Sequence, residues 1–415
     1  MVEPATFEIT ALGAQGDGIA TGPTGTVFVP FALPGERWAR ESSGFALQGP
    51  SSPERQTAPC RHFGTCGGCV AQHLTPAAYA RWKRQILVDA FQKADINAAV
   101  APLRTISPGS RRRLVLSARM LPSGVAIGYH ARGSDRLLAI EECTIADPMI
   151  IEAMPALHQL AARLLPRRDE MRMTVTRCDA GLDVAIEGGK KDIDAADRAV
   201  LADVTAKARI LRLSADRDVV IRHADPILTM GTVKVVPPPN VFLQASVEAE
   251  RALIELVSAA VGKAKAVVDL FSGLGTFALP LALKARVLAV DSDAAALGAL
   301  DAAARNSQGL KPIEIRTRDL VREPLARKEL EGFDAVVFDP PRAGAETQAA
   351  MLAKSTVAKV VAVSCNPTSL ARDAGILLDG GYELESLTPI DQFLYSHHLE
   401  AVAVFARPSG KKRKR

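Results

Sequence analysis

The second half of the chain alternates short apolar runs with stretches of helical spacing. Residues 246–261 have helical spacing, as do residues 276–284 and a segment that ends at Asn306. The apolar runs predicted to be strands are 266–270, 286–290, 313–316, 335–338, 359–363 and 401–405. Continuous apolar strands separated by helices are typical of a mostly parallel sheet covered on both faces. In such sheets the chemistry lies in loops at the carboxyl ends of the strands.

The first half of the chain has a different pattern. Residues 7–40 form alternating runs between glycine-rich turns, which predicts a small antiparallel barrel, and the Ser-, Pro- and Gly-rich residues 41–59 are predicted to be a linker. Helical spacing follows over 73–94. From Arg113 to Leu228 short strands alternate with helices, including 148–165 and 194–208.

The chain is long enough for two or three domains, since a domain averages roughly 150 residues. Pro237-Pro238-Pro239 marks the clearest boundary. We predict a multidomain protein with four parts: an OB-like β-barrel over 1–52, an α+β central domain over 53–236, a Rossmann-like α/β domain over 237–410 and a basic tail over 411–415.

The net charge of +5 is unevenly distributed. Residues 1–59 carry −3, residues 60–235 carry +7, residues 236–410 carry −4, and the tail 411–415 carries +5. The central part contains clustered arginines, which are typical of a surface that binds phosphate but also of an ordinary solvated surface. These arginines are Arg111, Arg112, Arg113, Arg132, Arg136, Arg167, Arg168, Arg172 and Arg177. The charge distribution therefore favours the central domain as the part that would meet a phosphate-rich partner such as RNA.

Composition excludes several classes of protein. Hydrophobic residues are 48% and charged residues 23%, close to the averages for a folded globular chain. No apolar run reaches the roughly 18 residues that span a bilayer. The first twenty residues include Glu3, Glu8 and Asp17 and no basic start, unlike a secretory signal. We expect a cytoplasmic protein with no membrane contact.

A glycine turn follows the first strand of the α/β domain. Gly273 and Gly275 stand between that strand and a helix, and Asp291 ends the next strand about twenty residues on, where it can accept ribose hydroxyls. This arrangement also suits dinucleotides. The strand carries its own acid, Asp269, and the turn after it has only two of the three glycines expected for a dinucleotide site. Both features favour S-adenosylmethionine over NAD.

Two further motifs follow predicted strands. Asp339-Pro340-Pro341-Arg342 leaves a carboxylate facing a planar ligand, and the arginine takes the place of the aromatic residue usual in enzymes that methylate amines. Cys365 lies between Ser364 and Asn366, where a thiolate can add to carbon 6 of a uracil and activate carbon 5. Glu400 is the predicted base that removes the carbon-5 proton; His397 and His398 are competing bases.

Three cysteines lie within ten residues and a fourth follows later. In a cytosolic chain they are unlikely to form disulfides, and four thiolates suit tetrahedral zinc or an iron–sulfur cluster. The compact trio with one distant cysteine favours a [4Fe–4S] cluster, with zinc as the alternative; the predicted ligands are Cys60, Cys66, Cys69 and Cys143. Cys178 is left over and is predicted to be structural.

Taken together, these motifs resemble the RNA 5-methyluridine methyltransferase family, over nearly the whole chain. The resemblance implies a TRAM domain for residues 7–40, in which Asp17 and the segment Val27–Glu36 match its pattern, and packing of helix 73–94 on the catalytic domain. It implies Cys365 as nucleophile, Glu400 as general base and Asp339 at the target-base pocket. The implied donor site comprises Gln244, Asp269, Phe271, Gly273, Gly275, Asp291, Asp319 and Asp339.

The chain departs from the family pattern at Ala245-Ser246, where Val-Asn is frequent, and the change at Ser246 is expected to alter donor contacts. The expected activity is S-adenosylmethionine-dependent methylation of carbon 5 of one uridine in a structured RNA. We favour 23S ribosomal RNA over transfer RNA, and a monomer with no obligate protein partner. The alternatives are a cytosine-5 RNA methyltransferase and a non-catalytic RNA-binding or redox-sensing protein.

Overall fold

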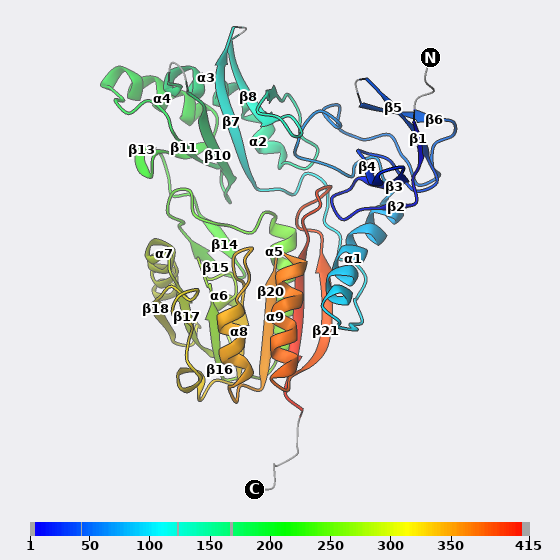
Figure 1. Cartoon of the computed structure of the whole chain (residues 1–415). Helices are drawn as coiled ribbons and strands as arrows, with labels where there is room; N and C mark the ends of the chain where they lie inside the picture. The colour runs from blue at the N-terminus through cyan, green and yellow to red at the C-terminus, as the bar shows by residue number, and fades with distance from the viewer. Residues whose placement is uncertain (1–4, 43, 123, 167–168, 409–415) are drawn as a thin grey trace.

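The computed structural model of the protein describes residues 5–408, except 43, 123, 167 and 168. The basic tail 411–415 and the arginines Arg167 and Arg168 therefore lie outside the described residues. Figure 1 shows an N-terminal β-rich part, a central sheet with helices, and a C-terminal α/β domain below them. In the described part of the chain, no helix combines the length and the apolar character needed to cross a bilayer.

The N-terminal part consists of two small antiparallel sheets. Their strands are β1 (Thr6–Glu8), β2 (Ala11–Leu12), β3 (Gly18–Gly22), β4 (Gly25–Val29), β5 (Arg37–Glu41) and β6 (Gly44–Gln48). One sheet has the order β1-β5-β6 and the other β2-β3-β4. Phe7, Ile9 and Val29 belong to the core that these strands share.

The prediction of a linker over 41–59 is wrong for the first part of this range, because β6 lies there. β6 pairs with β5 in the register Arg37↔Gln48, and the Phe45 ring packs edge-on against Phe7 with centroids 6.0 Å apart. Composition suggested a linker because Ser and Gly surround this strand. The alternation of Phe45 and Leu47 with small or polar residues is the signal that composition hid.

The central domain is built on a seven-stranded sheet with the order β13-β12-β11-β10-β7-β8-β9. The strands are β7 (Arg113–Leu121), β8 (Gly124–His130), β9 (Leu137–Ala139), β10 (Met171–Arg177), β11 (Leu182–Glu187), β12 (Ile210–Ala215) and β13 (Asp218–Arg222). The helices α2 (Pro148–Glu152), α3 (Met154–Leu164) and α4 (Ala195–Lys207) share an apolar core with it. Residues 148–165 form two helices because Pro155, the second residue of α3, lacks the N–H that would continue the first helix.

The C-terminal domain has a second seven-stranded sheet, of order β18-β17-β16-β19-β20-β22-β21. A β14 (Leu228–Met230) and β15 (Val233–Val235) hairpin precedes it. The strands of the sheet are β16 (Ala266–Leu270), β17 (Arg286–Asp291), β18 (Ile313–Thr317), β19 (Ala335–Phe338), β20 (Lys359–Ser364), β21 (Glu383–Ile390) and β22 (Glu400–Ala406). β16 to β20 run parallel, and β22 runs antiparallel to both β20 and β21. The mostly parallel sheet is therefore as predicted, but the strand β21 was not predicted from the sequence.

Helices cover both faces of this sheet. They are α5 (Val247–Val261), α6 (Ala278–Ala282), α7 (Ala294–Arg305), α8 (Glu346–Ala353) and α9 (Pro367–Asp379), with a short 3-10 helix, η1 (Arg327–Leu330). All five side chains of β16 are buried, so alternate residues of this strand belong to two different apolar cores. This two-sided burial explains why the strand is a continuous apolar run.

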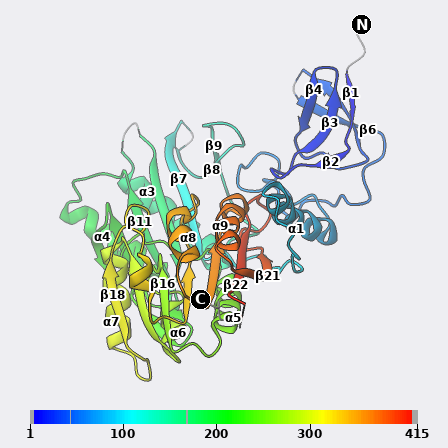
Figure 2. The same cartoon turned by 60° about the horizontal axis from the view of Figure 1, so that its bottom comes forward.

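The helix α1 (Pro76–Lys93) comes early in the chain but packs on the C-terminal domain. It lies beside β21 and α9 in two views of the molecule (Figures 1 and 2). Leu87 and Phe91 are fully buried in the apolar core that also contains residues of β19, β20 and α9. Other residues of α1 contact the N-terminal part, where Trp82 Nε1 donates to the Gly13 carbonyl at 2.9 Å, and the loop between β21 and β22.

Candidate active site

The loops at one edge of the catalytic sheet surround a cavity of about 520 Å³. Parallel strands end at a common edge, and β22 runs the other way, so its first residue lies there too. Ser364 of β20 pairs with Ala401 of β22, which places Cys365 opposite Glu400. The predicted residues that line this cavity are Gln244, Phe271, Gly273, Asp291, Asp319, Asp339, Cys365 and Glu400.

Two residues of the predicted donor site do not line the cavity. Asp269 is within β16 and fully buried, and this burial raises the pKa of its carboxyl group. Gly275 has φ +89°, and a Cβ atom there would lie 2.4 Å from Cδ1 of Leu300 in α7. Close packing of the turn against α7 is therefore what requires glycine at this position.

A chain of hydrogen bonds joins the two carboxyl groups of the cavity. Gln244 Nε2 donates to Asp339 Oδ2 at 2.8 Å. Gln392 Nε2 donates to both Gln244 Oε1 at 2.7 Å and Glu400 Oε2 at 2.9 Å. Gln392 fixes the orientation of the Gln244 amide. The Gln392 N–H donates to the Gln244 oxygen, so the Gln244 nitrogen faces Asp339. Gln392 was not predicted, because no spacing or motif marks a single glutamine in a loop.

Burial dominates the electrostatics of both acids. It raises the pKa of Asp339 to about 7, while the hydrogen bond from Gln244 acts in the opposite direction. Burial and then the charge of Asp339 raise the pKa of Glu400 well above its ordinary range. A raised pKa suits a carboxylate that must accept a proton during a reaction.

The thiol of Cys365 is protonated at neutral pH. Burial, followed by the negative charges of Glu400 and Asp339, raises its pKa to about 11, and Arg342 opposes this shift. Arg342 also lines the cavity. A reaction that uses the thiolate therefore needs a positive charge or a proton acceptor close to the sulfur when substrate is bound.

The other end of the cavity has the features of a nucleotide site. Asp291 Oδ2 accepts from the Gly273 N–H at 2.9 Å, which fixes the carboxylate beside the glycine turn. Phe271 adopts φ 59° at the end of β16, and Ser272 has a buried hydroxyl that forms no hydrogen bond with the described residues. Asp319 Oδ1 accepts from the Val321 N–H at 3.0 Å. A volume of about 520 Å³ is in the range of cofactor sites.

The two histidines that competed with Glu400 do not line the catalytic cavity. His398 is among the residues that line the cavity of the cysteines, and its ring contacts Arg342, a residue of the catalytic cavity. Burial and the neighbouring positive charges lower the pKa of His398 to about 4. Ser246, the departure from the family pattern, does not line the cavity either: its hydroxyl caps α5 by accepting from the Ala249 N–H. The side chain therefore has a helix-capping role, and its effect on donor binding stays a prediction.

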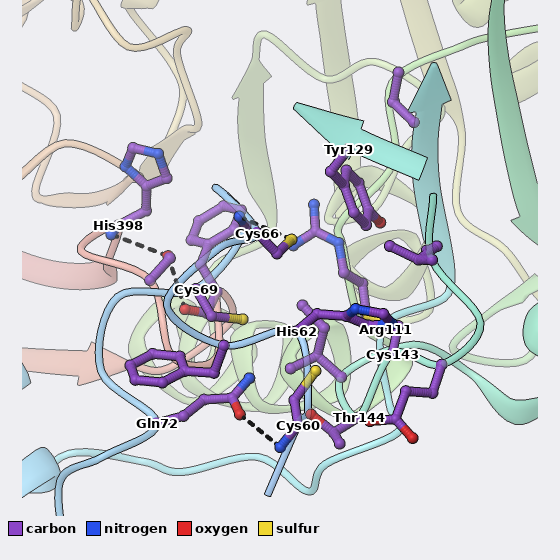
Figure 3. A pocket seen from close by; sticks show the side chains of 18 residues that line it. Cys60, His62, Cys66, Cys69, Gln72, Arg111, Tyr129, Cys143, Thr144 and His398 are labelled. Carbon is purple, nitrogen blue, oxygen red and sulfur yellow. Dashed lines mark hydrogen bonds between the residues drawn. The ribbon is translucent and has the colours of Figure 1, made fainter. Parts of the chain in front are cut away.

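The four predicted cluster ligands line a second cavity, of about 270 Å³ (Figure 3). They come from two parts of the chain, the loop before α1 and the segment after β9; they are Cys60, Cys66, Cys69 and Cys143. In the described ranges, however, no group of three or more His, Cys, Asp or Glu side chains is arranged to hold a metal ion. All four cysteines are free thiols, and burial raises the pKa of Cys69 to about 12. The structure thus brings the four cysteines to the lining of one cavity.

The two cavities are neighbours, a relation for which the sequence offered no signal. The Phe393 side chain lines both of them. Directly after Cys69, the N–H groups of Val70 and Ala71 donate to the Tyr395 carbonyl at 2.8 and 3.2 Å. The cysteine loop is therefore hydrogen-bonded to the loop that leads into Glu400.

Comparisons with known proteins find similar RNA methyltransferases. A family model described as tRNA (Uracil-5-)-methyltransferase matches residues 203–407. An uncharacterized RNA methyltransferase of Brucella suis biovar 1 is 47% identical over 413 residues, which cover 98% of this chain and 99% of that protein. The 23S rRNA (uracil(1939)-C(5))-methyltransferase RlmD of Acinetobacter baylyi is 30% identical, over 97% of this chain and 96% of that protein.

A solved structure has the same overall fold. The tRNA (uracil-54, C5)-methyltransferase of Pyrococcus abyssi, in complex with S-adenosyl-L-homocysteine, superimposes with a TM-score of 0.77 at 24% identity. The match covers 97% of this chain and 99% of that one, so the multidomain methyltransferase fold is confirmed. The chain belongs to the RNA (uracil-5-)-methyltransferase family, as the resemblance of its motifs implied.

The raised pKa of Cys365 predicts how its reactivity depends on pH. The rate of its alkylation by iodoacetamide should rise about tenfold for each pH unit between about 7 and 10, because the thiolate fraction grows as the pH approaches about 11. Mass spectrometry of the peptide that contains Cys365 measures this rate without interference from the other cysteines. Arg342→Met should lower the rate at each pH, since the opposing positive charge is lost. A rate that levels off below about pH 9 contradicts the assignment.

Proposed function

We propose that this protein methylates carbon 5 of one uridine in a structured RNA, with S-adenosylmethionine as methyl donor. The observation that carries the proposal is the single cavity in which Cys365, Asp339 and Glu400 lie beside the glycine turn and Asp291. A nucleophilic thiol, a buried base and a nucleotide site are the groups that this reaction requires.

The residues at the donor end fit this cofactor. The Asp291 carboxylate, held by the Gly273 N–H, is placed to accept ribose hydroxyls, and Phe271 and Asp319 form the adjoining walls. Gln244 lies between this end and Asp339. Bound S-adenosylmethionine supplies an electrophilic methyl group. The chain has to hold the target ring between that group and Cys365.

The thiolate of Cys365 is proposed to add to carbon 6 of the uracil, so that an S–C bond forms and the ring electrons gather at carbon 5. Carbon 5 then acts as the nucleophile that takes the methyl group, and the bond from that methyl to the donor sulfur would break to leave S-adenosylhomocysteine. Glu400, opposite Cys365 at the sheet edge, accepts the carbon-5 proton, and the S–C bond breaks to release the thiolate. Glu400 has to be ionised for this step, and its raised pKa makes it a stronger base once it is. The target base has to leave its stack to reach this cavity.

Ribosomal RNA is the proposed substrate class. The RlmD relative, which aligns over nearly the full length, is named for 23S rRNA, and the central residues 60–235 carry a charge of +7. The N-terminal strands β1 to β6 are proposed to form the TRAM-like RNA-binding barrel. Since residues 1–59 carry −3, that part is expected to bind RNA through shape and stacking. We propose that the protein acts in the cytoplasm as a monomer.

The second cavity is proposed to hold a [4Fe–4S] cluster, with zinc as the alternative. Its support is the convergence of Cys60, Cys66, Cys69 and Cys143 on one enclosed space. Methyl transfer needs no electron acceptor, so the proposed role is structural: the cluster would tie the loop before α1 to the segment after β9.

A test of the reaction and of the substrate compares nucleosides from cells without this gene after complementation. Wild-type protein should restore 5-methyluridine in the ribosomal RNA fraction, and Cys365→Ala should restore none, since the nucleophile is absent. Mass spectrometry of separated ribosomal and transfer RNA gives both answers. Restoration in transfer RNA alone would change the substrate class, 5-methylcytidine would indicate the cytosine enzyme, and full activity of Cys365→Ala would overturn the mechanism.

Glu400→Gln should allow addition and methyl transfer but block release, because an amide cannot accept the carbon-5 proton. A covalent complex of protein and methylated RNA should therefore accumulate and survive denaturing electrophoresis. The double variant Cys365→Ala/Glu400→Gln is the control that should form none. Rapid turnover by Glu400→Gln would assign the base to another group.

The cluster proposal predicts a metal content. Protein reconstituted with iron and sulfide without oxygen should hold about four iron and four sulfide per chain, and Cys66→Ser should lose most of this. Cys178→Ser is the matched control, because Cys178 is buried away from the cavity and should have no effect. Bound zinc with no iron would favour the alternative, and identical iron content in the Cys66 and Cys178 variants would refute the site.

A further inference from the structure

Lys83 in α1 is fully buried and contacts the loop that precedes Glu400. Its side chain has 0% exposure, as does that of Asp391, with which Lys83 Nζ forms an ion pair at 2.9 Å. The same nitrogen donates to the carbonyls of Phe393 at 3.2 Å and Ser396 at 3.0 Å, and to that of His398. One ammonium group thus binds the backbone of residues 391–398 from several sides.

Tyr79, one helical turn earlier, binds the same loop. Its hydroxyl donates to Asp391 Oδ2 at 2.7 Å and accepts from the Tyr395 N–H at 2.8 Å. The Tyr79 and Tyr395 rings also pack together, with centroids 5.5 Å apart. We refer to Tyr79, Lys83 and Asp391 as the α1 clamp.

The loop that the α1 clamp holds carries residues of the catalytic cavity. Gln392 follows Asp391 directly and donates to Glu400 Oε2 and Gln244 Oε1. Phe393 lines the cavity, and Glu400 begins β22 where the loop ends. Displacement of the loop would therefore move the Gln392 amide and, with it, the carboxyl group of Glu400.

Burying an ammonium group is costly unless its hydrogen bonds are satisfied, so this clamp has a role beyond packing. Part of the loop has no regular backbone pairing of its own, and the cation supplies partners to three of its carbonyls. The cysteine loop adds two hydrogen bonds to the Tyr395 carbonyl. The geometry of the loop is thus determined by a helix more than 300 residues away in sequence.

We infer that Tyr79 and Lys83 are positioning residues, which hold Gln392 and thereby aim Glu400 at the carbon-5 proton. This inference rests on the proposed function. Only the elimination step uses the Glu400 carboxylate. Loss of the α1 clamp should therefore slow elimination more than it slows the earlier addition and methyl-transfer steps.

The test uses Tyr79→Phe, which removes one hydroxyl and keeps the ring. Full-length protein is mixed with total RNA from cells that lack the gene and with methyl-labelled S-adenosylmethionine. The first-turnover rate of methyl incorporation should change by less than about threefold, while the covalent protein–RNA adduct should live on the order of ten times longer than in wild type, the size of effect that the loss of one buried hydrogen bond gives. Lys83→Met should lengthen the adduct lifetime further.

Tyr382→Phe is the matched control. Tyr382 is 3% exposed and Tyr79 4%, and the Tyr382 hydroxyl donates to the Val357 carbonyl at 2.8 Å, before β20 and at the edge opposite the cavity. The Tyr382→Phe variant should have the same adduct lifetime as wild type. Equal adduct lifetimes in Tyr79→Phe and wild type would overturn the inference. An equal lengthening of the adduct lifetime in Tyr79→Phe and Tyr382→Phe would also overturn it. So would a decrease in the rate of methyl incorporation as large as the change in adduct lifetime.

Glu400→Gln, measured in the same assay, separates this inference from the proposed function. If Glu400→Gln accumulates adduct and Tyr79→Phe does not, the inference fails and the mechanism stands. If Glu400→Gln forms no adduct, the assignment of the base fails, and the inference fails with it.

Discussion

The active site depends on one constraint, the hydrogen-bonded register of β20 with its neighbours. Parallel pairing with β19 brings Cys365 and Asp339 to the same edge, and antiparallel pairing with β22 brings Glu400 to face Cys365. The proposed nucleophile and the proposed base, which come from strands that run in opposite directions, therefore meet across one pair of strands. A shift of one residue in either pairing would turn these side chains away from the cavity.

The chemistry of the site follows from its burial. Glu400 is buried and Asp339 is partly buried, and this burial raises the pKa of both carboxyl groups. Gln244 and Gln392 connect them without adding charge, so that each acid retains a defined orientation. Such preorganisation lets the residues act on a bound ring without rearranging.

Much of the fold was predictable because it depends on local pattern. The buried strands β16 and β19 were predicted with their bounds, since both are continuous apolar runs between helices. β21 was missed because only part of an edge strand is buried, and its sequence mixes Glu, Ser and Leu. The motif residues that follow strands were found for the same local reason, whereas Gln392 and Lys83 were not. Their roles come from contacts between distant segments, which no periodicity records.

The antiparallel end of the catalytic sheet has a consequence for the order of folding. Among the described residues β22 is the last strand along the chain, and the loop before it satisfies the buried Lys83 ammonium of α1. While the chain is being synthesised, α1 emerges early but cannot complete these contacts until residues 391–406 have appeared. Such long-range closure is slow compared with local helix formation. The proposed catalytic base, Glu400, can therefore reach its final position only after the segment that contains it has packed against α1.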